Sequence, residues 1–150
     1  MSGRGPPSRA PGAQVARGEP FTREQRERLD RARDAAQAQT GILFSVRIGQ
    51  VDGDVDLTAE HALANLVAAP REPAVLILVS PGQRFVRVMT TPGAKRRISD
   101  QAAGLAVLTM TSSFGHGDIV GGVINGLRQL ADSSTVDESA NEYPAPAITS

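Results

Sequence analysis

Ala-Val-Leu-Ile-Leu-Val, at residues 74–79, is the longest continuous run of apolar side chains in the sequence. A short run of this kind predicts a central strand that is covered on both faces. The turn-forming residues Ser-Pro-Gly-Gln follow at 80–83, and residues 84–90 then place Val86 and Val88 on one face. This pattern predicts a hairpin whose second strand runs antiparallel to the first.

Two helices and a second strand are predicted before this central strand. Thr22 and Gln25 have the spacing of a capping box, which predicts a helix start, and Gly41 predicts the end of that helix. Residues 42–48 predict a strand, and residues 58–69 predict a helix. A strand, a crossover helix and a strand form a right-handed unit, so we expect the strands at 42–48 and in the centre to be parallel.

Two further helices are predicted at residues 100–111 and 118–131, where apolar side chains recur at helical spacing. Helices before, between and after the strands would cover both faces of the sheet. The predicted fold class is therefore α/β. We expect a three-layer α/β/α sandwich around a small mixed sheet, made of a parallel pair plus an antiparallel hairpin strand.

The 150 residues suit one domain with two tails. Residues 1–20 are rich in Pro, Gly and Arg, and residues 132–150 carry acidic but no basic side chains. Such segments bury too little apolar surface to offset the entropy of ordering them. We therefore expect a folded domain at residues 21–131 between a disordered N-terminal tail and a disordered, acidic C-terminal tail.

The composition narrows the possible functions. The sequence has no cysteine and two histidines, which excludes disulfides, thiolate metal sites and a cysteine nucleophile. The formal net charge is zero and aromatic residues make up 3%, so a nucleic acid is not the expected partner. Neither a dinucleotide-binding fingerprint nor a P-loop motif occurs. Without a signal segment or a membrane span, we expect a monomeric cytoplasmic protein.

Three carboxylates lie close together at Asp52, Asp54 and Asp56. Carboxylate oxygens are ligands that Ca²⁺ and Mg²⁺ prefer, and a loop after the first strand lies where ligands gather in open α/β sheets. Leu57 and Leu63 stand where an EF-hand needs a glycine and a glutamate, so the loop is not an EF-hand. The alternative is a solvated turn in which the aspartates serve the backbone geometry. Ca²⁺ or Mg²⁺ is thus a candidate metal, and no cofactor is firmly predicted.

The approach to the last helix offers further candidates. Asp118 is expected to be an N-cap that accepts backbone hydrogen bonds. Gly115, His116 and Gly117 precede it and could bind an anion or a partner through exposed backbone N–H groups. A lone histidine in a glycine-rich loop is, alternatively, a solvated side chain without such a role.

Glycines continue into this helix at Gly122 and Gly126. A glycine inside a helix costs about 0.5–1 kcal/mol relative to alanine, so another interaction must compensate. We expect that interaction to be close packing of the helix on the sheet; the alternative is a surface left bare for a ligand.

Lys95, Arg96 and Arg97 form the densest basic cluster. Three adjacent cations could meet phosphate, RNA or an acidic partner. The alternative is a solvated turn, since short charge runs commonly lie at the surface.

The most specific motif is Phe-Gly-His-Gly-Asp-Ile-Val-Gly-Gly-Val-Ile-Asn-Gly-Leu-Arg-Gln-Leu at residues 114–130. It resembles the closing motif of TPM domains, in which an aromatic residue, a Gly-Asp pair, spaced glycines and a terminal leucine recur. The resemblance extends to Gln-Thr-Gly at residues 39–41, to the strand and hairpin at 76–88 and to Asp100. It is nearest to an actinobacterial branch of unknown function.

This resemblance implies an α/β/α sandwich and three kinds of activity among relatives. They include a plant thylakoid lumen protein credited with acid phosphatase activity, photosystem repair factors and an acetylcholine-receptor modulator. Some TPM domains bind calcium in loops at one edge of the sheet. The resemblance therefore also implies a ligand role for Asp118.

Three functional hypotheses remain open. The first is a non-catalytic, TPM-like module that binds another protein. The shortage of catalytic residue types favours this hypothesis. The second is a phosphohydrolase of the acid-phosphatase type, in which Asp52, Asp54, Asp56 and Asp118 hold a metal that activates water. The third is a phosphate or RNA binder that uses residues 95–97.

Overall fold

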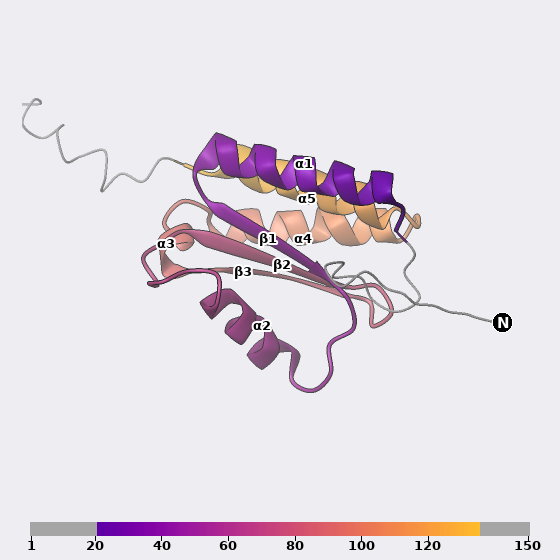
Figure 1. Cartoon of the computed structure of the whole chain (residues 1–150), viewed down its shortest axis with the longest axis horizontal. Helices are drawn as coiled ribbons and strands as arrows, with labels where there is room; N and C mark the ends of the chain where they lie inside the picture. Colours follow the sequence, from indigo (N-terminus) through magenta and orange to yellow (C-terminus); the bar gives the residue numbers. More distant parts are fainter. Residues whose placement is uncertain (1–20, 136–150) are drawn as a thin grey trace, which may run out of the picture.

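The structure, a computed structural model, describes residues 21–135, so the tails expected at residues 1–20 and 136–150 lie outside the described residues (Figure 1). Along the chain the elements are α1 (Arg23–Thr40), β1 (Leu43–Ile48), α2 (Val55–Ala64), β2 (Ala74–Ser80), β3 (Phe85–Thr90), α3 (Pro92–Lys95), α4 (Asp100–Phe114) and α5 (Ile119–Ser133). The last helix thus runs beyond the predicted domain end at residue 131. No helix within residues 21–135 is long and apolar enough to cross a membrane.

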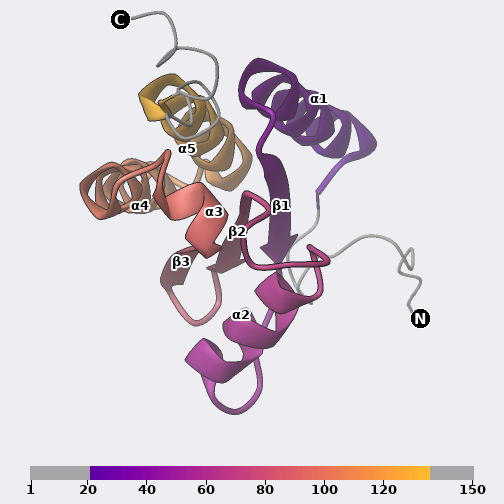
Figure 2. The same cartoon turned by 90° about the vertical axis from the view of Figure 1, so that its left-hand side faces the viewer.

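The strands form one sheet in the order β1-β2-β3. β1 and β2 are parallel, and β2 and β3 are antiparallel, as predicted. Helices α1, α4 and α5 cover one face of the sheet and α2 covers the other (Figure 2). The three-layer α/β/α sandwich with a small mixed sheet is therefore confirmed.

The central strand β2 is buried along its whole length, which confirms the prediction from its apolar run. Its pleat divides the core into two clusters. Val75, Ile77 and Val79 belong to the larger cluster, with side chains of α1, α4 and α5. Leu76 and Leu78 belong to the smaller cluster under α2. One strand with an apolar run on both faces therefore holds the helical layers together.

The predicted ends of α1 are confirmed. The Thr22 hydroxyl accepts a hydrogen bond from the Gln25 N–H at 3.0 Å, and the Gln25 side chain accepts one from the Thr22 N–H at 2.9 Å. Gly41 ends the helix at φ 75°, a left-handed conformation that glycine adopts at little cost. Its N–H donates to the Gln37 carbonyl oxygen at 2.7 Å, and β1 begins directly afterwards.

The prediction of a helix at residues 58–69 is wrong in position. α2 begins at Val55 because Asp54 acts as its N-cap and accepts a hydrogen bond from the Leu57 N–H at 3.0 Å. The helix ends at Ala64, and turns occupy the segment that leads to β2. In these turns the Glu72 carboxylate accepts a hydrogen bond from the Ala68 N–H at 2.8 Å.

The glycines of α5 explain how that helix packs. A Cβ placed on Gly122 would lie 2.8 Å from the Ser113 Cβ, and one on Gly126 would lie 2.7 Å from the Met110 Cγ. Close packing is therefore the reason for these glycines, but the neighbour is α4 and not the sheet as predicted. The absence of a side chain lets the two helices approach each other.

Thr91 joins three segments around the start of β2, and its side chain is buried. Its hydroxyl donates to the Glu72 carbonyl oxygen at 2.7 Å and accepts from the Ala74 N–H at 3.0 Å. It also accepts from the Ala94 N–H at 3.3 Å, which caps the short helix α3.

We expect Thr91→Val to lower the free energy of unfolding by about 2 kcal/mol, measured by chemical denaturation. Valine has nearly the same shape but leaves the buried Ala74 N–H without an acceptor, a loss of about 1–3 kcal/mol. Thr91→Ser keeps the hydroxyl and should lose much less. Equal losses in the two variants would contradict a role for the hydrogen bonds.

Candidate functional site

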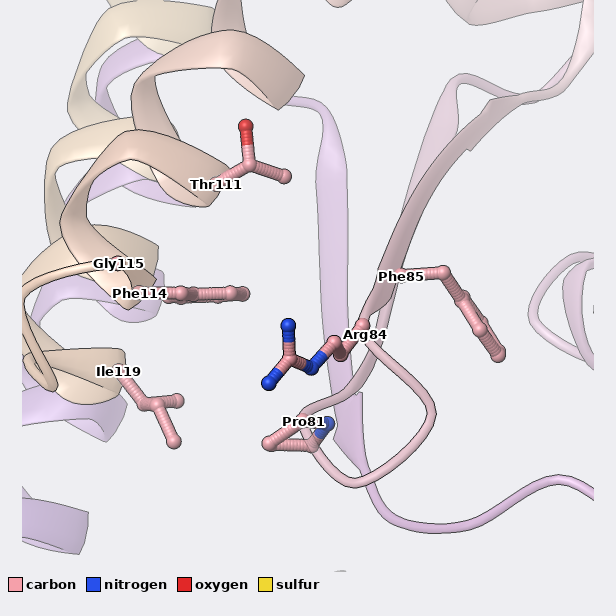
Figure 3. A pocket seen from close by; sticks show the side chains of 7 residues that line it. All are labelled: Pro81, Arg84, Phe85, Thr111, Phe114, Gly115 and Ile119. Atoms are coloured by element: carbon pink, nitrogen blue, oxygen red, sulfur yellow. The ribbon is translucent and has the colours of Figure 1, made fainter.

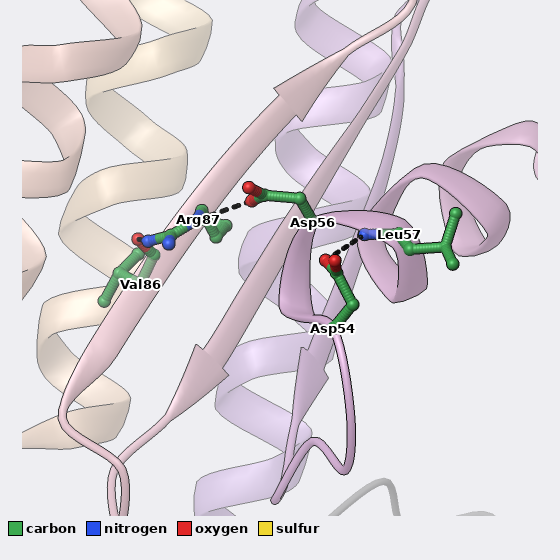
Figure 4. A network of polar contacts seen from close by, with 5 residues as sticks. All are labelled: Asp54, Asp56, Leu57, Val86 and Arg87. Atoms are coloured by element: carbon green, nitrogen blue, oxygen red, sulfur yellow. Dashed lines mark hydrogen bonds and ion pairs between the residues drawn. The ribbon is translucent and has the colours of Figure 1, made fainter.

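The three aspartates predicted as metal ligands differ in the contacts that they make within the chain. Asp54 caps α2, as described above. Asp56 lies in the first turn of that helix and pairs with Arg87 of β3 across 3.3 Å (Figure 4). Asp52 is exposed and has no hydrogen bond or ion pair within residues 21–135. The acidic loop thus starts a helix as well as forming a turn.

Asp118 is the N-cap of α5, where its carboxylate accepts a hydrogen bond from the Gly121 N–H at 2.9 Å. The described part of the chain contains no group of three or more His, Cys, Asp or Glu side chains placed to hold a metal ion. The four predicted ligands are therefore not brought together as one set. Asp118 makes the contacts of the predicted N-cap, and Asp54 caps a helix that was expected to begin later in the chain.

We expect Asp54→Ala and Asp118→Ala each to lower the free energy of unfolding by about 1 kcal/mol, because each removes the cap of a helix. Asp52→Ala is the matched control and should change it by less than about 0.5 kcal/mol. Denaturant titration of the three variants measures the difference. A loss of the same size in Asp52→Ala would show that the lost free energy of unfolding does not come from removing a helix cap.

The basic cluster is largely engaged within the chain. Lys95 pairs with Asp100 across 3.5 Å, and the Arg97 Nε donates to the Thr135 carbonyl oxygen at 2.6 Å. The Thr135 N–H donates in return to the Arg97 carbonyl oxygen at 2.9 Å. Arg96 is exposed. Arg97 therefore anchors the residues that follow α5, a role that the sequence did not indicate.

The predicted Gly-His-Gly segment forms the corner between α4 and α5. Gly117 has φ 81°, a conformation that favours glycine. His116 is exposed, with its Nδ1 atom 3.1 Å from the Ser112 carbonyl oxygen. Gly115 lines a cavity. Of the three residues, Gly115 is the one that lines this cavity.

That cavity has a volume of about 520 Å³ and lies between the β2–β3 turn and the α4–α5 corner (Figure 3). Pro81 and Arg84 line it from the turn, and Phe114, Gly115 and Ile119 line it from the corner. The Arg84 side chain extends toward Phe114 and Ile119. Among the described residues that line the cavity most are apolar, Thr111 adds a hydroxyl, and Arg84 is the one that carries a charge.

The exposed side of α4 is a second unassigned feature. From Gln101 to Gly117 the chain carries no Asp, Glu, Lys or Arg. Leu105 and Leu108 lie one turn apart and are 48% and 64% exposed, and Gly104 has open space beside it. We call these three residues the leucine face. α5 lies between α4 and α1, and no other helix of residues 21–135 covers the opposite side of α4 (Figure 2).

The sequence model of a protein family described as a domain of unknown function, DUF5130, matches residues 1–131. The chain belongs to this family. Two relatives from two strains of Mycobacterium tuberculosis, the uncharacterized proteins MT2543 and Rv2468c, are 30% identical over 103 residues. The alignment covers 69% of this chain and 60% of each relative, so the chain matches only part of their length. The family of unknown function and the mycobacterial relatives agree with the expected unknown function and actinobacterial origin, whereas the resemblance to TPM domains stays a prediction.

Solved structures share the fold of this DUF5130 member. The BA42 protein from Bizionia argentinensis aligns with a TM-score of 0.70 at 19% identity, over 78% of this chain and 83% of that protein. The N-terminal domain of the cg2496 protein from Corynebacterium glutamicum aligns with a TM-score of 0.64 at 15% identity, over 86% and 84%. At such identities the likeness concerns the architecture alone.

Proposed function

We propose that this member of the DUF5130 family is a non-catalytic protein-interaction module, and that the leucine face of α4 is its docking surface. One observation carries the proposal: two leucines are exposed side by side on a helix whose surface has no charged residue between Gln101 and Gly117. Charged side chains normally keep the solvent-facing side of a surface helix polar. Their absence here favours contact with another molecule.

The rest of the described chain supports a non-catalytic role. Asp54 and Asp118 serve as helix caps, and Asp56 is paired with Arg87. General acid–base chemistry needs a group positioned to exchange a proton with a substrate, and these contacts use the carboxylates for structure. Among the described residues that line the large cavity, only Arg84 carries a charge, and it acts as neither acid nor base at neutral pH.

The occupant that fits best is an apolar helix of a different protein. No atom lies within 4 Å of a Cβ placed on Gly104, so a partner backbone could approach α4 there. Leu105 and Leu108 lie beside that position and would pack against the partner's apolar side chains. Two leucines cover only the centre of an interface, with polar residues such as Gln101 and Ser112 at its rim.

The test compares three immobilised forms of the full chain, each exposed to an extract of cells of the organism that makes the protein. The first is unchanged, the second carries Leu105→Asn and Leu108→Asn, and the third carries Leu57→Asn on α2 as the matched control. Leu57 is 50% exposed, so its exposure is comparable. We expect one protein to be retained by the first and third forms and lost by the second, and then to form the same complex from purified components.

Retention by all three forms would contradict the proposed surface. Retention of the chain itself would point to a homodimer and overturn the proposal of a different partner. The double variant should lose no more than about 1 kcal/mol of its free energy of unfolding and Leu57→Asn should lose less, because asparagine forms helices less well than leucine. A larger loss in the Leu105 and Leu108 variant would assign those residues to the fold.

A second candidate is Ca²⁺ binding, which the TPM resemblance implies. One observation favours it: Asp52 lines a hollow of about 210 Å³ together with Gln50 and Thr58, whose side chains also carry oxygen atoms. One carboxylate with neutral oxygens would make a weak site. Millimolar Ca²⁺ should then shift the backbone amides of these residues in NMR spectra, and Asp52→Asn should abolish the shifts. Identical shifts in that variant would contradict binding at the hollow.

A further inference from the structure

The guanidinium of Arg84 lacks a partner in the described part of the chain. Its side chain extends into the cavity of about 520 Å³, toward Phe114 and Ile119 (Figure 3). No hydrogen bond or ion pair connects it with another side chain of residues 21–135. A guanidinium stays charged in proteins and offers five N–H donors in a plane. In the free protein, water must satisfy those donors.

The backbone at Arg84 supports a role for its side chain. Arg84 has φ 60°, and it is the one residue other than glycine with a positive φ between residues 21 and 135. Its N–H donates to the Pro81 carbonyl oxygen at 3.2 Å, which closes the β2–β3 turn. Glycine would adopt this conformation at lower cost. An arginine here is therefore tolerated by the turn rather than favoured by it.

The cavity walls indicate what kind of anion would fit. Pro81 lies on one side of the guanidinium, and Phe114 and Ile119 lie on the other, so a ligand would meet apolar surface beyond its charged group. The ring of Phe85 points away from this space, toward the side of the sheet that α2 covers. The volume lies within the range of small-molecule sites.

We propose that this cavity binds an organic monocarboxylate, with the carboxylate on the Arg84 guanidinium and the apolar part against Phe114 and Ile119. A planar guanidinium matches a carboxylate through two parallel hydrogen bonds. Arg84 is the one charged residue among the described residues that line the cavity, which suits a single negative charge better than a phosphate dianion. The carboxylate comes from a short-chain acid or from the C-terminus of a peptide that ends in an apolar residue. The described residues that line the cavity include none of the leucine face, so the proposal does not depend on docking there.

The test is an NMR titration of the isotope-labelled full chain. The probes are hexanoate and its neutral analogue hexanamide, N-acetyl-leucine and N-acetyl-leucinamide, and inorganic phosphate. We expect at least one acid to shift the Arg84 side-chain N–H and the amides of Gly115 and Ile119. The matching amide should bind at least tenfold more weakly. Hexanoate alone would identify a free acid as the ligand, and N-acetyl-leucine would identify a peptide end.

Three variants separate recognition from folding. Arg84→Gln should abolish binding of the acid, whereas Arg128→Gln, which changes an exposed arginine of α5, should retain it. Arg84→Gly should also abolish binding but keep or raise the melting temperature, because glycine suits the positive φ. Equal binding of acid and amide, tighter binding of phosphate, undiminished binding by Arg84→Gln or no shifts with either acid at millimolar concentration would each overturn the proposal.

Discussion

The variants Gly122→Ala and Gly126→Leu should each lower the free energy of unfolding by about 1–3 kcal/mol, because they insert atoms into the contact between α5 and α4. A Cβ on Gly122 would lie 2.8 Å from the Ser113 Cβ and 3.2 Å from the Met110 carbonyl oxygen. Backbone and Cβ atoms cannot move without shifting the helix. At Gly126 the larger leucine must displace the fully buried Met110.

The matched control is Gly104→Ala, an exposed position in the middle of α4 with no neighbour within 4 Å of the added Cβ. Alanine forms helices better than glycine, so this variant should raise the free energy of unfolding by about 0.5–1 kcal/mol. Thermal or denaturant unfolding measures all three. If Gly122→Ala and Gly104→Ala both stabilise the protein, the α5 glycines do not serve packing.

We expect the largest single effect from Gly93→Ala, a loss of about 3 kcal/mol or more. A Cβ at this position would lie 2.6 Å from the Arg71 carbonyl carbon and closer still to the attached oxygen. The obstacle is backbone, so no rotamer change relieves it. The displacement would also disturb the hydrogen bond from the Gly93 N–H to the Pro70 carbonyl oxygen, now 3.1 Å.

Gly82→Ala in the β2–β3 turn is the control for this variant, because nothing lies within 4 Å of its Cβ and its φ is not positive. We expect its free energy of unfolding to stay within about 0.5 kcal/mol of the unchanged protein. A Gly93→Ala variant of normal stability would show that the segment before β2 is free to move away from α3.

The sequence predicts the sheet well because its signals are local. Residues 74–79 have no polar side chain to place in water, so both faces had to be covered. The cap of α1 is also local, since Thr22 and Gln25 contact each other. By contrast, the sequence does not distinguish an aspartate in a loop from an aspartate that caps a helix. The sequence therefore does not show that α2 begins at Val55, with Asp54 as its N-cap.

The candidate sites depend on contacts between distant segments. Glycine spacing indicates close packing of α5, but it does not say whether the neighbour is α4 or the sheet. Likewise, Arg84 lines the same cavity as Phe114 and Ile119 only because the hairpin and the helix corner meet. The span without charged residues from Gln101 to Gly117 can be read directly from the sequence. Which side of α4 is exposed cannot be read from it, because that depends on how the helices pack.

Photocrosslinking from the leucine face tests the proposed interaction most directly. A photoreactive phenylalanine analogue replaces Leu108 in one form of the chain and Leu57 in the other. Each form is produced in the organism that makes the protein, and the living cells are irradiated. We predict one adduct with a different protein from position 108, absent from position 57 and lost when Leu105→Asn is added beside the probe. The same adduct from both positions, no adduct from position 108, or an adduct of twice the chain's own mass would contradict docking of a different protein on α4.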